Sequence, residues 1–130
     1  MKIGELALRS GCSIQTIRFY ERENLLPKPQ RSEGNFRLYD TKAQEKLLFI
    51  KRCRSLNLSL EEIRGLLDCK TTPTDCCHEI NQLVDAHLNT VKANIQELQS
   101  LKKQLEDLLR SCSQESTIED CGILQQLSQH

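Results

Sequence analysis

Residues 3–23, IGELALRSGCSIQTIRFYERE, contain two short amphipathic patterns separated by a turn. Apolar residues one helical turn apart predict a first helix that ends at Ser10-Gly11. Ser13 can cap a second helix that continues to about Glu23. Two helices joined by a glycine-containing turn form a helix-turn-helix, whose second helix can enter a DNA major groove.

The second helix is predicted to have one apolar face and one open face. Ile14, Ile17 and Phe19 supply the apolar positions. Because an Arg and a Tyr occupy the other face, we expect this helix to contact DNA. The residues expected to be available for contact are Gln15, Thr16, Arg18 and Tyr20.

A β-hairpin wing is predicted after this helix. LLPKP at 25–29 breaks the helix, and turn residues at 31–35 precede the alternating FRLY at 36–39. The alternation directs Phe36 and Leu38 inward and its other two residues outward, toward phosphates beside the groove. The DNA contacts predicted in this hairpin are Arg31, Asn35, Arg37 and Tyr39.

Two more helices are expected to complete the core of the first 70 residues. Thr41 and Ser59 each stand three residues before a Gln or Glu, which is the spacing of a capping box. The helices that they open cover roughly 41–55 and 59–69. Their apolar residues, which we expect in the core, are Leu47, Leu48, Ile50, Leu56, Leu60, Ile63, Leu66 and Leu67.

Charge divides the chain into two halves although the net charge of its 130 residues is zero. Through residue 60 there are 12 Lys and Arg against 6 Asp and Glu, and from residue 61 onward there are 6 against 12. The basic half fits a polyanionic partner, because neutralised phosphates supply much of the affinity of proteins for nucleic acid. The acidic half is not expected on the same phosphates.

A long helix is predicted from Asp75 to about Cys112, after a polar linker that contains Pro73. It contains neither Gly nor Pro, and its seam alternates steps of four and three, the heptad spacing of a two-stranded coiled coil. We expect a dimer, because the first 70 residues look too small to cover this seam. The seam positions are Val84, Leu88, Val91, Ile95, Leu98, Lys102, Leu105 and Leu109.

The seven cysteines indicate thiol or metal chemistry in a cytoplasmic protein. Their odd number argues against a disulfide framework, and there is neither a signal-peptide core nor an apolar run of the ~18–20 residues that a membrane span needs. Cys77 and Cys112 extend the seam by whole heptads, about 52 Å apart on one helix. An antiparallel partner would bring Cys77 of one chain to Cys112 of the other.

A third thiol, Cys121, follows a polar loop over residues 113–120 that we expect to be flexible. Cys77, Cys112 and Cys121 would form a three-thiolate cage, which suits soft or borderline metal ions. A structural zinc site remains an alternative, because zinc prefers four ligands. The candidates for a fourth ligand are Cys76, His78 and Asp120, while the cysteines interpreted as packing residues are Cys12, Cys53 and Cys69.

The predicted fold is mainly α and has three parts. Residues 1–70 form a winged helix-turn-helix domain, 71–112 a linker and an antiparallel coiled-coil dimerisation helix, and 113–130 a metal-binding loop and tail. The sequence does not indicate an enzyme, because it contains no Ser-His-Asp set, phosphate loop or paired-acid site. A protein that buffers metal or senses redox state through the same thiols, without DNA, is the alternative class.

Several motifs resemble the MerR family of bacterial transcription regulators across nearly the whole chain. They are IGELA at 3–7, TIRFYE at 16–21, LLP at 25–27, RSEGNFRLY at 31–39 and RCRSL at 52–56. The metal end, with Cys77, Cys112 and CGILQ at 121–125, is most similar to the cadmium- and lead-responsive branch.

The resemblance implies a dimer on a promoter whose two recognition elements are too far apart for RNA polymerase. Metal binding would bend and untwist the DNA, so that transcription of export or detoxification genes starts. The implied roles place Arg18 and Tyr20 on the recognition helix and Arg37 and Tyr39 in the wing. The implied metal ligands are Cys112 and Cys121 of one chain with Cys77 of the other.

The resemblance also bears on the choice of metal. Family members with cysteine at the Cys77 position respond to divalent ions, and Ser113 and Ile118 replace a Cys and a His of the zinc sensors. Mercury sensors have a similar gap between the last two cysteines. We therefore expect a cytoplasmic homodimer that responds to Cd(II) or Pb(II), with Zn(II) or Hg(II) as alternatives, and that has no membrane partner.

Overall fold

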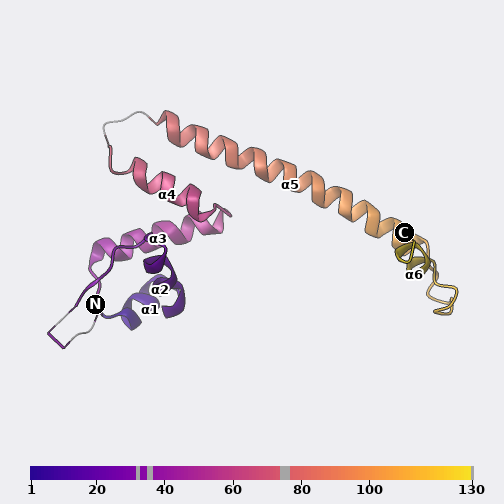
Figure 1. Cartoon of the computed structure of the whole chain (residues 1–130), viewed down its shortest axis with the longest axis horizontal. Coiled ribbons are helices and arrows are strands. Elements are labelled where there is room, and N and C mark those ends of the chain that lie inside the picture. Colours follow the sequence, from indigo (N-terminus) through magenta and orange to yellow (C-terminus); the bar gives the residue numbers. More distant parts are fainter. Residues whose placement is uncertain (32, 35–36, 74–76, 130) are drawn as a thin grey trace. The chain divides into compact units, whose positions relative to one another are not determined.

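The chain is built mainly from helices, as the sequence predicts (Figure 1). Two compact units, Met1–Leu83 and Val84–His130, divide it. The computed structural model describes all residues except 32, 35–36, 74–76 and 130. Within this described part, no helix has both the length and the apolar character needed to span a membrane. The elements are α1 (Ile3–Ser10), α2 (Ile14–Arg22), β1 (Gln30–Arg31), β2 (Arg37–Leu38), α3 (Thr41–Ser55), α4 (Leu60–Cys69), α5 (His78–Arg110) and α6 (Gly122–Leu127).

The first two helices and their turn form where the sequence predicts them. Gly11 closes α1 with a φ of 70°, a left-handed backbone conformation that glycine adopts without strain. The Ser13 hydroxyl accepts a hydrogen bond from the Thr16 N–H at 3.1 Å and caps α2. Both helices pack with α3 in the first unit, where Leu6 and Ile17 are fully buried (Figure 1).

The core of the first unit draws on α1, α2, α3 and α4. Leu47, Ile50 and Ile63 are buried and confirm their predicted core positions. Four of the other predicted core residues are partly buried: Leu48, Leu60, Leu66 and Leu67. The prediction for Leu56 is wrong, because this residue caps the C-terminus of α3 and its side chain is 66% exposed.

Asparagines in the left-handed conformation end α2 and α3. Asn24 has a φ of 60° and Asn57 a φ of 62°. After α2, the Leu25 N–H donates to the Tyr20 carbonyl at 2.9 Å, and the Asn24 N–H donates to the Glu21 carbonyl at 3.1 Å. This pair of bonds is a Schellman motif, which satisfies carbonyls that the helix leaves without partners. The equivalent pair closes α3.

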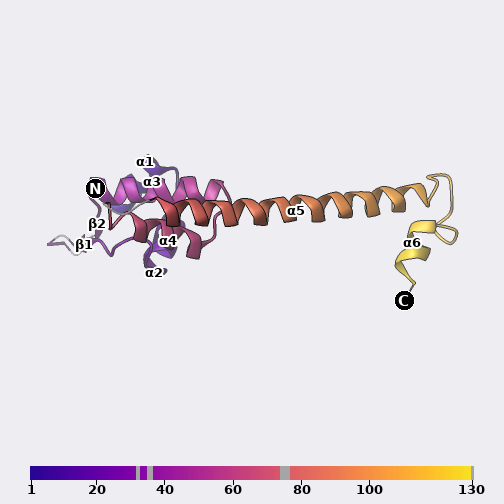
Figure 2. The same ribbon diagram turned by 90° about the horizontal axis from the view of Figure 1, so that it is seen from above.

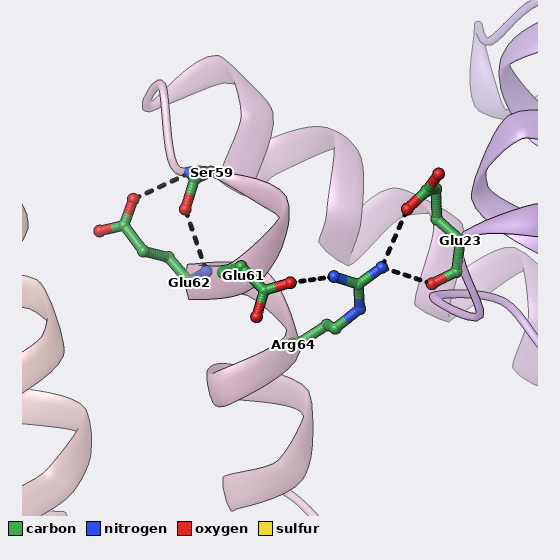
Figure 3. A network of polar contacts seen from close by, with 5 residues as sticks. All are labelled: Glu23, Ser59, Glu61, Glu62 and Arg64. Carbon is green, nitrogen blue, oxygen red and sulfur yellow. Dashed lines mark hydrogen bonds and ion pairs between the residues drawn. The ribbon is translucent and has the colours of Figure 1, made fainter.

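Helices α3 and α4 begin with different caps. Ser59 and Glu62 form the predicted capping box of α4, in which each side chain accepts a hydrogen bond from the other residue's N–H (Figure 3). At α3, the Asp40 carboxylate accepts a hydrogen bond from the Ala43 N–H at 2.9 Å. The prediction that Thr41 caps this helix is wrong, because Thr41 is already its first residue.

The wing is a short hairpin whose inward and outward residues differ from the prediction. β1 pairs antiparallel with β2, and Gln30 lies opposite Leu38. Leu38 is 40% exposed and Tyr39 only 4%. Tyr39 turns inward because its N–H donates to the Met1 carbonyl at 2.7 Å and its hydroxyl donates to the buried Glu21 carboxylate. The described part does not include Asn35, Phe36 or the side chain of Arg37.

α5 is a continuous helix of 33 residues. Its predicted first residue, Asp75, lies outside the described residues, and the helix ends at Arg110 rather than Cys112. The predicted loop and tail contain α6, a short helix that the polar composition does not indicate. The domain borders at residues 70 and 112 stay predictions.

Replacing Asp40 by alanine should lower the free energy of unfolding by about 1 kcal/mol, because the Ala43 N–H loses its acceptor. Thr41→Ala is the matched control and should change it by less than about 0.5 kcal/mol. Urea unfolding followed by circular dichroism measures both. Equal losses in the two variants would contradict the assignment of Asp40 as the cap.

Candidate metal centre and DNA-binding surface

Two of the three predicted metal ligands lie together in the second unit. Cys112 follows the end of α5, and Cys121 directly precedes α6; both are partly buried. Backbone hydrogen bonds within residues 113–121 fold the intervening chain into turns. As a result α6 lies beside the end of α5 (Figure 2).

Gly122 permits this return because α6 starts against the backbone that follows α5. A Cβ atom on Gly122 would lie 1.9 Å from the Ser111 carbonyl oxygen and 2.8 Å from its carbonyl carbon. These are backbone atoms, which cannot rotate away as the end of a flexible side chain can. The placement of Cys121 beside Cys112 therefore depends on the absence of a side chain at the next residue.

The two thiols differ in acidity because one donates a hydrogen bond to the other. The bond with Cys121 is the main cause that raises the pKa of the Cys112 thiol. The Leu124 N–H, followed by the bond from Cys112, lowers the pKa of Cys121. The Cys112 thiol also donates to the Ser113 carbonyl oxygen at 3.4 Å. The pair therefore favours ionisation of Cys121 over ionisation of Cys112.

Cys77, the third predicted ligand, is exposed at the residue before α5 in the first unit. It lines a surface pocket of about 360 Å³ together with Cys69, Thr72, Pro73, His78, Glu79 and Ile80. Among the residues that the structure describes, no group of three His, Cys, Asp or Glu side chains is arranged to hold a metal ion within one chain. Of the candidates for a fourth ligand, Asp120 accepts a hydrogen bond from the Thr117 hydroxyl at 3.3 Å, and Cys76 lies outside the described residues.

The cysteines predicted as packing residues belong to the first unit. Cys53 is buried in the core, where burial raises its pKa, and Cys12 packs against the same core. Cys69 is partly buried, and its Sγ lies 4.0 Å from a carboxylate oxygen of Glu79. Their contacts agree with packing roles for Cys12 and Cys53.

A basic pocket lies between α2 and the wing. Its volume is about 340 Å³, and the lining residues are Arg18, Glu21, Arg22, Lys28, Pro29 and Arg31. Four of these six side chains are cationic, which suits a phosphate-bearing ligand. Arg22 and Lys28 were not among the predicted contacts. Arg22 could have been found from the sequence, because a spacing of four residues places it on the same helix face as Arg18.

The predicted DNA contacts on α2 divide into exposed and buried residues. Gln15 and Arg18 are exposed and Thr16 is partly exposed. The expectation that Tyr20 and Tyr39 are available at the surface is wrong, because their side chains are only 7% and 4% exposed. Burial raises the pKa of Tyr20, while the nearby Arg54 guanidinium opposes this shift. Both tyrosines pack in the core and hold the helix and wing that carry the exposed residues.

These features define the class of winged helix-turn-helix proteins with a thiol pair in a separate C-terminal unit. Residues 1–70 match the family model described as MerR HTH family regulatory protein, and residues 44–108 match the one described as MerR, DNA binding. The chain belongs to the MerR family of regulatory proteins.

Relatives and solved structures agree with this assignment. The chain is 43% identical over 108 residues to the HTH-type transcriptional regulator ZntR homolog of Haemophilus influenzae, covering 83% of this chain and 80% of the relative. It is 32% identical over 126 residues to the mercuric resistance operon regulatory protein of Bacillus cereus, covering 97% and 96%. The lead(II) complex of the transcription regulator PbrR691 from Ralstonia metallidurans CH34 matches with a TM-score of 0.89 and 51% identity, over 98% of this chain and 99% of that chain.

Replacing Cys112 by alanine should raise the pKa of Cys121, because its thiolate loses a hydrogen-bond donor. The pH midpoint for alkylation of Cys121 by iodoacetamide should rise but stay below that of an ordinary thiol, since the Leu124 N–H remains. Peptide mass spectrometry across a pH series measures this midpoint. Ser113→Ala, which leaves both thiols in place, should keep the midpoint of the unmodified protein, and an unchanged midpoint in Cys112→Ala would refute the pairing.

Gly122→Ala should separate the two thiols, because the added Cβ would overlap the Ser111 carbonyl. Overpacking of this kind costs about 1–3 kcal/mol, enough to reduce the paired population by roughly tenfold. The rate at which diamide joins Cys112 to Cys121, followed by peptide mapping, should fall accordingly. Gly4→Ala is the control, because no atom lies within 4 Å of its added Cβ; equal rates in both variants would show that Gly122 is not required.

Proposed function

We propose that this chain is a cytoplasmic, homodimeric transcriptional regulator that activates metal-resistance genes by distorting promoter DNA when Cd(II) or Pb(II) binds. The observation that carries the proposal is the Cys112–Cys121 thiol pair, which follows the long helix of a MerR-family chain. The pKa of one of its sulfurs, Cys121, is lowered, which favours the thiolate, the form that binds metal.

The exposed seam of α5 supports the homodimer. Six of its apolar side chains within the second unit are 48–70% exposed: Val84, Leu88, Ile95, Leu98, Leu105 and Leu109. A contiguous apolar surface of this kind on a helix is typical of an interface between proteins. Its heptad spacing favours a second copy of the same helix as the partner.

The third sulfur is proposed to come from Cys77 of the second copy. Cys77 and Cys112 flank opposite ends of α5, and an unbroken helix of 33 residues rises about 50 Å. An antiparallel pair of such helices would place the start of one beside the end of the other. Cys112 and Cys121 of one chain and Cys77 of the other would then hold the ion.

The donor set favours a soft divalent ion. Three thiolates suit Cd(II), Pb(II) or Hg(II), whereas Zn(II) prefers four ligands in a tetrahedron. The likeness to a regulator solved with lead(II) supports Pb(II), and the ZntR homolog and the mercuric resistance regulator among the relatives keep Zn(II) and Hg(II) as alternatives. The positive charge of a bound ion would attract the three thiolates and hold them together.

The proposed DNA surface consists of the exposed face of α2 and the basic pocket beside the wing. Gln15, Thr16 and Arg18 would contact DNA from α2, and Arg31 would contact phosphates from the hairpin. Asn35 and Arg37 stay predicted contacts. An ion that binds one conformation of the dimer more tightly would shift the population toward that conformation. The DNA held by the dimer would then change shape, and RNA polymerase would meet the distorted promoter.

Cys77→Ser, Cys112→Ser and Cys121→Ser should each abolish metal-induced transcription in a purified polymerase assay while leaving DNA binding intact. Each removes a thiolate from the cage, and none lies on the proposed DNA surface. Cys12→Ser, which alters a packing residue, should retain the response. A gel shift that detects no DNA binding by the unmodified protein would overturn the regulator and favour a metal buffer.

A mixture of Cys77→Ser and Cys112→Ser chains tests whether the cage is shared between chains. A heterodimer would contain an intact cage, with Cys112 and Cys121 from the first chain and Cys77 from the second. Sulfur-to-metal charge-transfer absorption during cadmium titration should therefore rise on mixing above that of either homodimer, each of which keeps only two of the three sulfurs at a site. No rise on mixing would contradict the shared cage, because a cage within one chain would be broken in every subunit.

A further inference from the structure

Arg64 on α4 is connected to the C-terminal end of α2 (Figure 3). Its Nη2 donates to the Glu23 carbonyl oxygen at 2.6 Å and to the Glu23 carboxylate at 3.1 Å. Its Nη1 donates to the Glu61 carboxylate, one turn earlier on α4. The guanidinium therefore joins the first turn of α4 to the last turn of α2, between residues that are 41 positions apart in the sequence.

The acceptor on α2 is a backbone group at the helix end. Glu23 is the C-cap, and the Schellman bonds of Asn24 and Leu25 use the carbonyls of Glu21 and Tyr20 rather than that of Glu23. A cation at this end of a helix also meets the negative pole of the helix dipole. Arg64 thus satisfies a carbonyl with favourable charge, and no substitution of the Glu23 side chain removes this bond.

The other side of the connection is fixed within α4. The Ser59–Glu62 capping box closes the first turn of α4, and Glu61 holds the second arm of the Arg64 guanidinium (Figure 3). Both arms are therefore engaged, in a geometry that the planar guanidinium allows and a lysine ammonium does not. The Glu23 side chain is 40% exposed, compared with 83% for Glu61, so the contact with α2 is the better shielded of the two.

We propose that Arg64 is a positioning residue for DNA recognition: it sets the direction of α2 by anchoring the C-terminal end of that helix to α4. The inference rests on the proposed function, in which α2 contacts DNA. Side chains that read base edges need a defined approach, whereas attraction to phosphates tolerates small changes in direction. Arg22, which lines the basic pocket, is the residue next to the anchored Glu23.

The consequence is a loss of selectivity rather than a general loss of affinity. Without Arg64, the end of α2 must become ordered when DNA binds. The free-energy cost of this ordering weakens the complexes in which base contacts require an ordered helix. A hydrogen bond to a charged donor is worth enough to weaken specific binding by about tenfold. Binding to unrelated duplexes should change by less than about threefold, because removal of one cation alters phosphate attraction only modestly.

The test uses a duplex selected from a randomised DNA library by the unmodified protein, and a scrambled duplex of the same composition. Fluorescence anisotropy measures both affinities at a temperature at which circular dichroism shows each variant folded. Arg64→Gln should bind the selected duplex about tenfold more weakly, with little change on the scrambled duplex. Arg64→Lys, which keeps the charge but has a single donor centre, should show an intermediate loss and supplies the measurement if Arg64→Gln does not fold.

Arg9→Gln is the matched control for charge. Arg9 is an exposed α1 residue in a surface ion pair with Glu5 at 2.8 Å. Its loss therefore removes a cation from the same unit and leaves the contact between Arg64 and Glu23 in place. It should preserve the ratio of the two affinities. Unchanged selectivity in the Arg64 variants, or an equal loss on both duplexes, would overturn the positioning role. Failure of the unmodified protein to enrich any duplex would instead overturn the proposed function.

Discussion

The buried hydrogen bond from the Tyr39 hydroxyl to the Glu21 carboxylate organises the DNA-binding unit. A carboxylate that is only 7% exposed is costly to bury without a donor, so the Glu21 side chain requires a nearby hydroxyl or cation. Tyr39 supplies one from the end of the wing, and its backbone pairs with Met1. The wing, the chain start and α2 therefore meet at one polar contact, which also borders the basic pocket.

The sequence predicted the helices well because the signals that start and end a helix involve residues close together in the chain. Ser13 and the Ser59–Glu62 box cap helices as expected, since a cap needs only residues within one turn. The errors arise where contacts between residues far apart in the sequence determine the position of a side chain. Alternation alone directed Tyr39 outward, whereas Glu21 and Met1 draw it inward. Leu56 was expected in the core, but the turn at Asn57 ends its helix first.

The candidate site shows the same division. The thiol chemistry of Cys112 and Cys121 could be inferred from residue types and their position after a long helix. Their direct hydrogen bond could not, because it depends on how closely α6 approaches Ser111. Arg22 and Lys28 join the basic pocket only once the hairpin folds beside α2. Spacing identifies chemical groups, while tertiary packing determines which of them become neighbours.

In the proposed sensor, the hydrogen bond between Cys112 and Cys121 would couple metal binding to pH. Both thiols must lose their protons before both can bind the ion, and the raised pKa of Cys112 makes its proton the harder one to remove. Acidification makes that release harder, so a more acidic cell would need more of the inducing ion to reach the same occupancy. The metal concentration at which the regulator responds would then depend on pH as well as on the ion itself.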